Sequence, residues 1–113
     1  MISNTLIAHA ESAAAFLTLM GNEKRLLIVA YLIDGEMSVG AIAEKVQLSQ
    51  SALSQHLAKL RALDLVETRR DRQMIYYSCN SEAVRELLRM LEGVFGDGDL
   101  SQMAYRLRRA GGA

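Results

Sequence analysis

The chain has 113 residues with 13 basic and 13 acidic side chains, and half of its residues are hydrophobic while only six are aromatic. A chain of this length forms one domain with a modest core, so we expect residues 1–113 to be a single domain. The zero net charge argues against a basic tail that binds polyanions without selectivity. One cysteine excludes an internal disulfide, and no segment has the pattern of a signal peptide or a membrane span, so we expect a soluble cytoplasmic protein with no membrane partner.

The scarcity of aromatic residues and the absence of proline favour a mainly helical core. Residues 4–20 predict a first helix that is apolar on nearly every side, and a second copy of the chain is the natural cover for it. Asn22 can cap a second helix that reaches about Ile33. The inward-facing residues expected on that helix are Leu26, Leu27, Val29, Ala30 and Ile33.

Two short capped segments follow. Ser38 precedes the helical run VGAIAEKV, and Ser49 precedes the run QSALSQHLAKLR. Between them, Gln47 and Leu48 leave room only for a tight turn. A short helix, a turn and a second capped helix form the helix-turn-helix plan, which we assign to residues 38–61.

Beyond the second of these helices the apolar period changes from that of a helix to that of a strand. The runs LVETRR and MIYYSC predict a two-stranded hairpin over residues 65–79, joined around Asp71, Arg72 and Gln73. A hairpin beside a helix-turn-helix is the wing of a winged helix-turn-helix. The predicted fold class is therefore mainly α, with five or six helices and a small two-stranded β-hairpin.

A last amphipathic helix is predicted over residues 81–95, capped by Asn80 or Ser81. Its apolar residues recur at helical spacing, namely Val84, Leu87, Leu88, Leu91 and Phe95. Residues 96–113 form a C-terminal extension that we expect to add a turn or two of helix and then fray.

The helix that follows Ser49 carries an unusual polar face. Its apolar residues form a narrow seam for docking on the domain, namely Leu53, Leu57 and Leu60. The opposite side carries slim residues, namely Ser51, Ser54, Gln55 and Ala58. Such side chains fit the major groove of DNA, where glutamine can pair bidentately with adenine. The alternative is an ordinary solvated face, although such faces usually favour Glu, Lys and Arg.

Positive charge is concentrated in the same region, because residues 49–80 carry five basic and three acidic side chains. Long cationic side chains on a protruding hairpin suit phosphates or a narrow minor groove. The alternative is a charged tip that only protects an edge strand from aggregation. The predicted DNA-contacting residues are Ser49, Gln50, Ser51, Ser54, Gln55, His56, Lys59 and Arg61 on the helix, and Arg69, Arg70, Arg72 and Gln73 on the hairpin. For His56, which lies about 60° from the leucine seam, a partly buried structural role stays open beside a phosphate contact.

With these residues in place, the sequence resembles the ArsR/SmtB family of bacterial winged-helix repressors. The resemblance covers about residues 12–95 and rests on GNEKRLLIVAYL, LSQSALSQHLAKLR and the hairpin RRDRQMIYYS. It is strongest with the family's metal-independent nodulation-repressor group. The resemblance implies a homodimer, held by the helices over residues 4–20 and 81–95, that binds a pseudo-palindromic operator in double-stranded DNA at the bacterial nucleoid and represses by occluding the promoter.

Many members of this family bind a metal through a Cys-x-Cys pair at the start of the first helix of the helix-turn-helix, where this chain has Ser38 and Gly40. The remaining potential ligands, His9, His56 and Cys79, are scattered along the sequence, whereas a transition-metal site needs several converging ligands. We therefore expect no metal and no other cofactor, and we expect Cys79 to be a small apolar strand residue. No small-molecule effector can be named.

Two other functions stay open. One is a metal- or redox-responsive sensor repressor with a site across the dimer interface, and the other is a winged-helix module for protein interaction that has lost DNA binding. We do not expect an enzyme, because the sequence has no Gly-rich phosphate loop, no clustered carboxylates and no nucleophile and base at a catalytic spacing.

Overall fold

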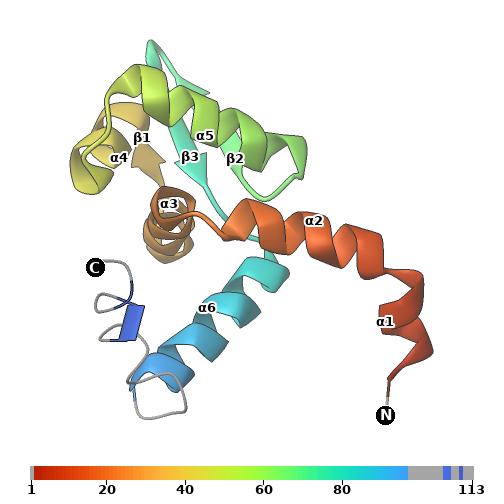
Figure 1. The fold of residues 1–113 in the computed structure, drawn as a ribbon. Coiled ribbons are helices and arrows are strands. Elements are labelled where there is room, and N and C mark those ends of the chain that lie inside the picture. Colours follow the sequence, from red (N-terminus) through yellow and green to blue (C-terminus); the bar gives the residue numbers. More distant parts are fainter. Residues whose placement is uncertain (1, 97–105, 108–109, 111–113) are drawn as a thin grey trace. The chain divides into compact units, whose positions relative to one another are not determined.

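The computed structural model describes residues 2–96, 106–107 and 110, and its mainly helical fold with a small sheet confirms the predicted fold class (Figure 1). The chain divides into two compact units, Met1–Ser81 and Glu82–Ala113. None of the helices in the described residues is long and apolar enough to cross a membrane. The elements are α1 (Asn4–Ala8), α2 (Ala10–Met20), α3 (Glu23–Asp34), β1 (Met37–Ser38), α4 (Val39–Val46), α5 (Gln50–Ala62), β2 (Glu67–Asp71), β3 (Met74–Ser78) and α6 (Glu82–Gly96).

The first helix is interrupted. His9 leaves the helical conformation, with φ −113° and ψ 17°, and separates α1 from α2. Its Nδ1 lies 3.0 Å from the carbonyl oxygen of Thr5, so the ring donates a local hydrogen bond back to the preceding turn. The continuous helix predicted over residues 4–20 was therefore wrong at His9, because a side chain that bonds its own backbone competes with helix propagation.

Helix α3 begins where the sequence predicts, because the side chain of Asn22 accepts a hydrogen bond from the backbone N–H of Arg25 at 3.0 Å. Its buried residues are Ile28, Val29 and Leu32. Leu27, predicted to face inward, is 38% exposed. The helix is apolar on several sides, so its hydrophobic period did not determine which side faces the core. The predicted burial of Leu27 was therefore wrong.

The core of the first unit forms where α3, α4 and α5 pack against one another. Lys24 on α3 donates a hydrogen bond of 2.6 Å to the carbonyl of Val46, so a cation lies at the C-terminal end of α4, where the helix dipole favours it. The fully buried residues of these helices are Ile28, Val29, Leu32, Ile42, Val46, Leu53, Leu57 and Leu60.

The wing has three strands instead of the two predicted. Strands β2 and β3 pair antiparallel, with Thr68 opposite Tyr77, and β1 adds to the other side of β3, with Met37 opposite Tyr77. A two-residue strand such as β1 is too short to show a period in the sequence. Residues 65 and 66 are buried but precede β2, which begins at Glu67.

The second unit contains α6, which begins after Ser81 as predicted. Its exposed side carries two ion pairs between residues three apart, Arg85 with Glu82 and Arg89 with Glu86. Val84 is buried, whereas Phe95 at the other end of the predicted apolar row is exposed. The helical turn predicted within residues 96–113 lies almost entirely outside the described residues.

His56 connects α5 to α3. Nη1 of Arg25 donates a hydrogen bond of 3.3 Å to Nδ1 of His56, and Nε of the same guanidinium donates one of 2.6 Å to the carbonyl of Leu19 at the end of α2. Partial burial lowers the pKa of His56, and the charges of Arg25 and Lys59 lower it further. The neutral ring therefore accepts a hydrogen bond from Arg25, and this contact holds α5 against α3.

This geometry predicts that the protein loses stability as the pH falls. Below 6.5, the ordinary pKa of histidine, the unfolded chain binds a proton that the folded His56 resists, so protonation favours unfolding. Urea unfolding measured above and below that pH should show that the free energy of unfolding of the wild-type protein declines as the pH falls. The decline should be smaller in His56→Gln. An identical pH dependence in the variant would contradict the assignment.

Candidate nucleic-acid interface

Each helix of the α4–α5 pair begins at a serine cap, and backbone geometry forms the turn between them. Ser38 Oγ accepts a hydrogen bond from the N–H of Ala41, and Ser49 Oγ accepts one of 3.1 Å from the N–H of Ala52. Between the helices Gln47 adopts a left-handed conformation with φ 57°, which reverses the chain within two residues. Both caps were predicted from the sequence: Ser38 marks the start of α4 and Ser49 the start of α5.

Helix α5 presents its polar side chains outward, as the sequence predicts. Its leucine seam is buried, while Ser51, Ser54, Gln55 and Ala58 are exposed. Among the described residues, the side chains of Ser51, Ser54 and Gln55 make no hydrogen bond or ion pair. Their donors and acceptors are therefore available to an external partner. The exposed helix residues predicted at the site also include Gln50, Lys59 and Arg61.

Two of the residues predicted as DNA contacts have partners inside the protein. Ser49 is the cap of α5, and the half-buried His56 lies against Arg25. Neither position excludes a further contact, but both side chains first serve to position α5. The sequence predicted the cap, and it left His56 open between a structural and a phosphate-contacting role.

Arg69 also has an internal partner, at the root of the wing. Its guanidinium binds both carboxylate oxygens of Glu36, at 2.9 Å and 2.6 Å, and lies 4.8 Å from the centre of the Tyr76 ring. The ion pair lowers the pKa of Glu36 and raises that of Arg69. Local sequence patterns could not indicate this contact, because Glu36 precedes Arg69 by 33 positions.

The tip of the wing carries the other predicted cations. Arg70 and Asp71 end β2, and the exposed Arg72 and Gln73 form the turn to β3. Arg72 has a φ of 59°, a left-handed conformation that glycine or asparagine adopts more easily. An arginine therefore occupies a position where the backbone alone would favour another residue.

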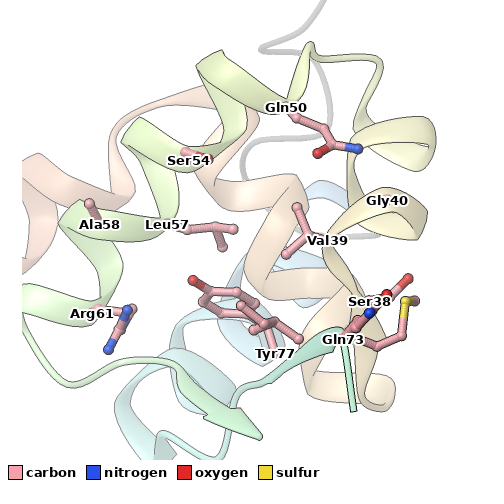
Figure 2. A pocket seen from close by; sticks show the side chains of 12 residues that line it. Ser38, Val39, Gly40, Gln50, Ser54, Leu57, Ala58, Arg61, Gln73 and Tyr77 are labelled. Carbon is pink, nitrogen blue, oxygen red and sulfur yellow. The ribbon is translucent and has the colours of Figure 1, made fainter. Parts of the chain in front are cut away.

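A hollow of about 620 Å³ connects the helix to the wing (Figure 2). It lies between the start of α4, one side of α5, and β3 with the hairpin tip. Four predicted site residues line it, namely Gln50, Ser54, Arg61 and Gln73. Ser51, Gln55 and Lys59 form the adjoining stripe along α5. The sequence had also placed Ala58 on this face, but it missed lining residues such as Tyr77 and Gly40, because they follow the pattern of a strand and of a helix start.

The described residues contain no group of three His, Cys, Asp or Glu side chains arranged to hold a metal ion. Ser38 is engaged as the cap of α4, and Cys79 is buried. Hydroxyl and glycine positions offer none of the thiolate, imidazole or carboxylate ligands that transition metals prefer.

The cap of α5 generates a stability prediction. Ser49→Ala should lower the free energy of unfolding by about 1 kcal/mol, because the N–H of Ala52 loses its acceptor. Ser51→Ala, two positions along the same helix, should change it by less than about 0.5 kcal/mol. Urea denaturation measures both. An equal loss in the two variants would show that the cap does not hold the helix start.

Comparison with known proteins finds a matching family model and related structures with the same architecture. The family model described as "Bacterial regulatory protein, arsR family" matches residues 22–68. The nodulation protein NolR of Rhizobium meliloti is 61% identical over 88 residues, which are 78% of this chain and 72% of NolR. The crystal structure of NolR from Sinorhizobium fredii has a TM-score of 0.77 at 55% identity and covers 85% of this chain and 96% of that one.

A more distant structure, the fragment 1–100 of Mb0332 from Mycobacterium bovis, is described as a homodimeric winged helix-turn-helix DNA-binding domain. It is 30% identical, with a TM-score of 0.67, and covers 83% of this chain and 87% of that one. The winged helix-turn-helix and the resemblance predicted from the sequence are thereby confirmed. This chain belongs to the ArsR family of bacterial regulatory proteins, and within it the chain is similar to NolR.

Proposed function

We propose that this protein is a transcriptional regulator that binds a specific site in double-stranded DNA as a homodimer and needs no metal. The observation that carries the proposal is the outward face of α5. Its serine and glutamine side chains have no partners among the described residues, and its leucines are buried on the other side. A helix so oriented can enter the major groove and bring donors and acceptors to base edges.

The neighbouring elements supply the contacts that position such a helix. Arg70, Arg72 and Gln73 at the wing tip, with Lys59 and Arg61 on α5, can bind phosphates on either side of the groove. Ser49, Gln50, Ser51, Ser54 and Gln55 lie at the start of α5 and are assigned to the bases and the adjacent backbone. His56 and Arg69 are assigned to positioning α5 and the wing, because each has an internal partner.

A homodimer is supported by apolar side chains that a single copy leaves exposed. Leu6, Ile7 and Leu17 are exposed on α1 and α2, and Met90 and Phe95 are exposed on α6. A second copy covering these helices would bury them. Two copies of α5 related by a two-fold axis would read a pseudo-palindrome, with half-site centres about 10 to 10.5 base pairs apart or a multiple of this.

Occlusion of a promoter would make the protein a repressor, as the family resemblance implies. The proposal assigns no role to a metal, and the described residues contain no group of three potential metal ligands. The proposed contacts use binding groups only, without a nucleophile and base in catalytic geometry, so we assign no enzymatic activity.

Gln55 tests the assignment to bases. A duplex selected from a random library with the wild-type protein should be bound about 1–3 kcal/mol more weakly by Gln55→Ala, with relaxed preference at one or two base pairs. Binding to an unrelated duplex should change little. An equal loss on both duplexes would assign Gln55 to phosphates.

Arg72→Gln and Arg69→Gln make the same change at two positions of the hairpin. Arg72→Gln should reduce the slope of log affinity against log salt by about one, because a phosphate contact is lost. Arg69→Gln should reduce it less, since Glu36 already neutralises Arg69. Titrations of the selected duplex at several salt concentrations compare the two. Equal slopes would contradict an internal role for Arg69.

A further inference from the structure

The residues that line the hollow between α5 and the wing have the charge expected of a site that binds an anion. Thirteen acidic side chains balance thirteen basic ones over the whole sequence, yet no acidic residue lines the hollow and one cation, Arg61, does. Among the described residues, the Arg61 side chain makes no ion pair or hydrogen bond. A partner with negative charge would therefore meet an available guanidinium and no repelling carboxylate.

Tyr77 supplies a second observation at the same place. Its side chain lies on β3 and is only 8% exposed, and within the described residues its hydroxyl makes no hydrogen bond. No fully buried side-chain polar atom of those residues lacks a partner, so this hydroxyl is partly accessible, and Tyr77 lines the hollow. Figure 2 shows it pointing toward the side on which Ala58 and Arg61 lie.

The walls of the hollow are apolar around these two groups. Met74 and Ile75 on β3 are 48% and 40% exposed, and Leu57 and Ala58 come from α5. Exposed apolar side chains beside an available cation and hydroxyl suit a ligand that joins an apolar part to an anion. A sugar-phosphate segment of DNA has this composition, and a strand contacting both α5 and the wing tip would have to pass between them.

We infer that the hollow binds one deoxyribose-phosphate segment of a DNA strand, with the phosphate held by the guanidinium of Arg61 and the hydroxyl of Tyr77. The inference rests on the proposed function and adds Tyr77 to its contacts. The phenol donates to a phosphate oxygen, Arg61 neutralises the charge, and the sugar packs on Met74 and Ile75. The segment also couples the position of the wing to that of α5 on the same strand.

The direct test removes one oxygen atom. Tyr77→Phe should bind the selected duplex about tenfold more weakly, the loss expected for one hydrogen bond to a charged group, with an unchanged salt slope because no charge is removed. Tyr76→Phe makes the same change at the next residue of β3, whose ring lies under Arg69, and should alter affinity by no more than about twofold. Wild-type affinity in Tyr77→Phe would overturn the inference.

A second pair of variants tests the hollow without touching Tyr77, should its substitution unfold the protein. Ala58→Glu places a carboxylate in the hollow beside Arg61, whereas Ala62→Glu places one at the exposed end of the same helix, outside the hollow. Ala58→Glu should bind the duplex at least about tenfold more weakly than Ala62→Glu. Equal affinities of Ala58→Glu and Ala62→Glu for the duplex would contradict the proposal that a DNA phosphate occupies the hollow.

Single neutral methylphosphonates, scanned along one half-site of the duplex, identify the phosphate. One position should weaken the wild-type protein and have a clearly smaller effect on Tyr77→Phe, because both changes remove the same contact. Equal effects on both proteins at every position would overturn the inference. If the wild-type protein selects no duplex, the proposed function fails; if it selects one but Tyr77→Phe and Ala58→Glu behave as their controls, only this inference fails.

Discussion

The burial of Leu53, Leu57 and Leu60 on one side of α5 is the constraint on which the candidate interface depends. Each buried leucine contributes about 1.5–3 kcal/mol, so a rotation of the helix that exposed the seam would lose more than any outward polar contact could return. The seam therefore determines that serine and glutamine side chains face away from the core. The cap at Ser49 determines where α5 begins along the chain.

The wing is joined to this helix by contacts that link distant parts of the chain. Glu36, just before β1, binds Arg69 on β2, while β1 extends the sheet and leads directly into α4. The hairpin is thus attached to the first helix of the helix-turn-helix at its root, and its tip carries Arg72 and Gln73 outward. An exposed ion pair contributes little stability by itself, but a bidentate pair fixes the direction of the two side chains. The proposed DNA contact of the wing needs such a fixed direction.

Local patterns in the sequence were sufficient to predict most of the fold and which face of α5 points outward. Caps such as Asn22 and Ser49 act on residues three positions away, and the leucine period is repeated over several turns, so both can be identified without tertiary information. The missed features depend on distant contacts or on single residues: the break at His9, the pairing of Met37 with Tyr77, the partner of Arg69, and the exposure of Tyr77 to a hollow.

The central claim is that the outward face of α5 reads DNA, and NMR shift mapping with a selected palindromic duplex tests it most directly. The account predicts that the largest changes fall on the side-chain amides of Gln50 and Gln55 and on the wing tip around Arg72. Changes confined to α2 and α6, with α5 unaffected at saturating duplex, would contradict it.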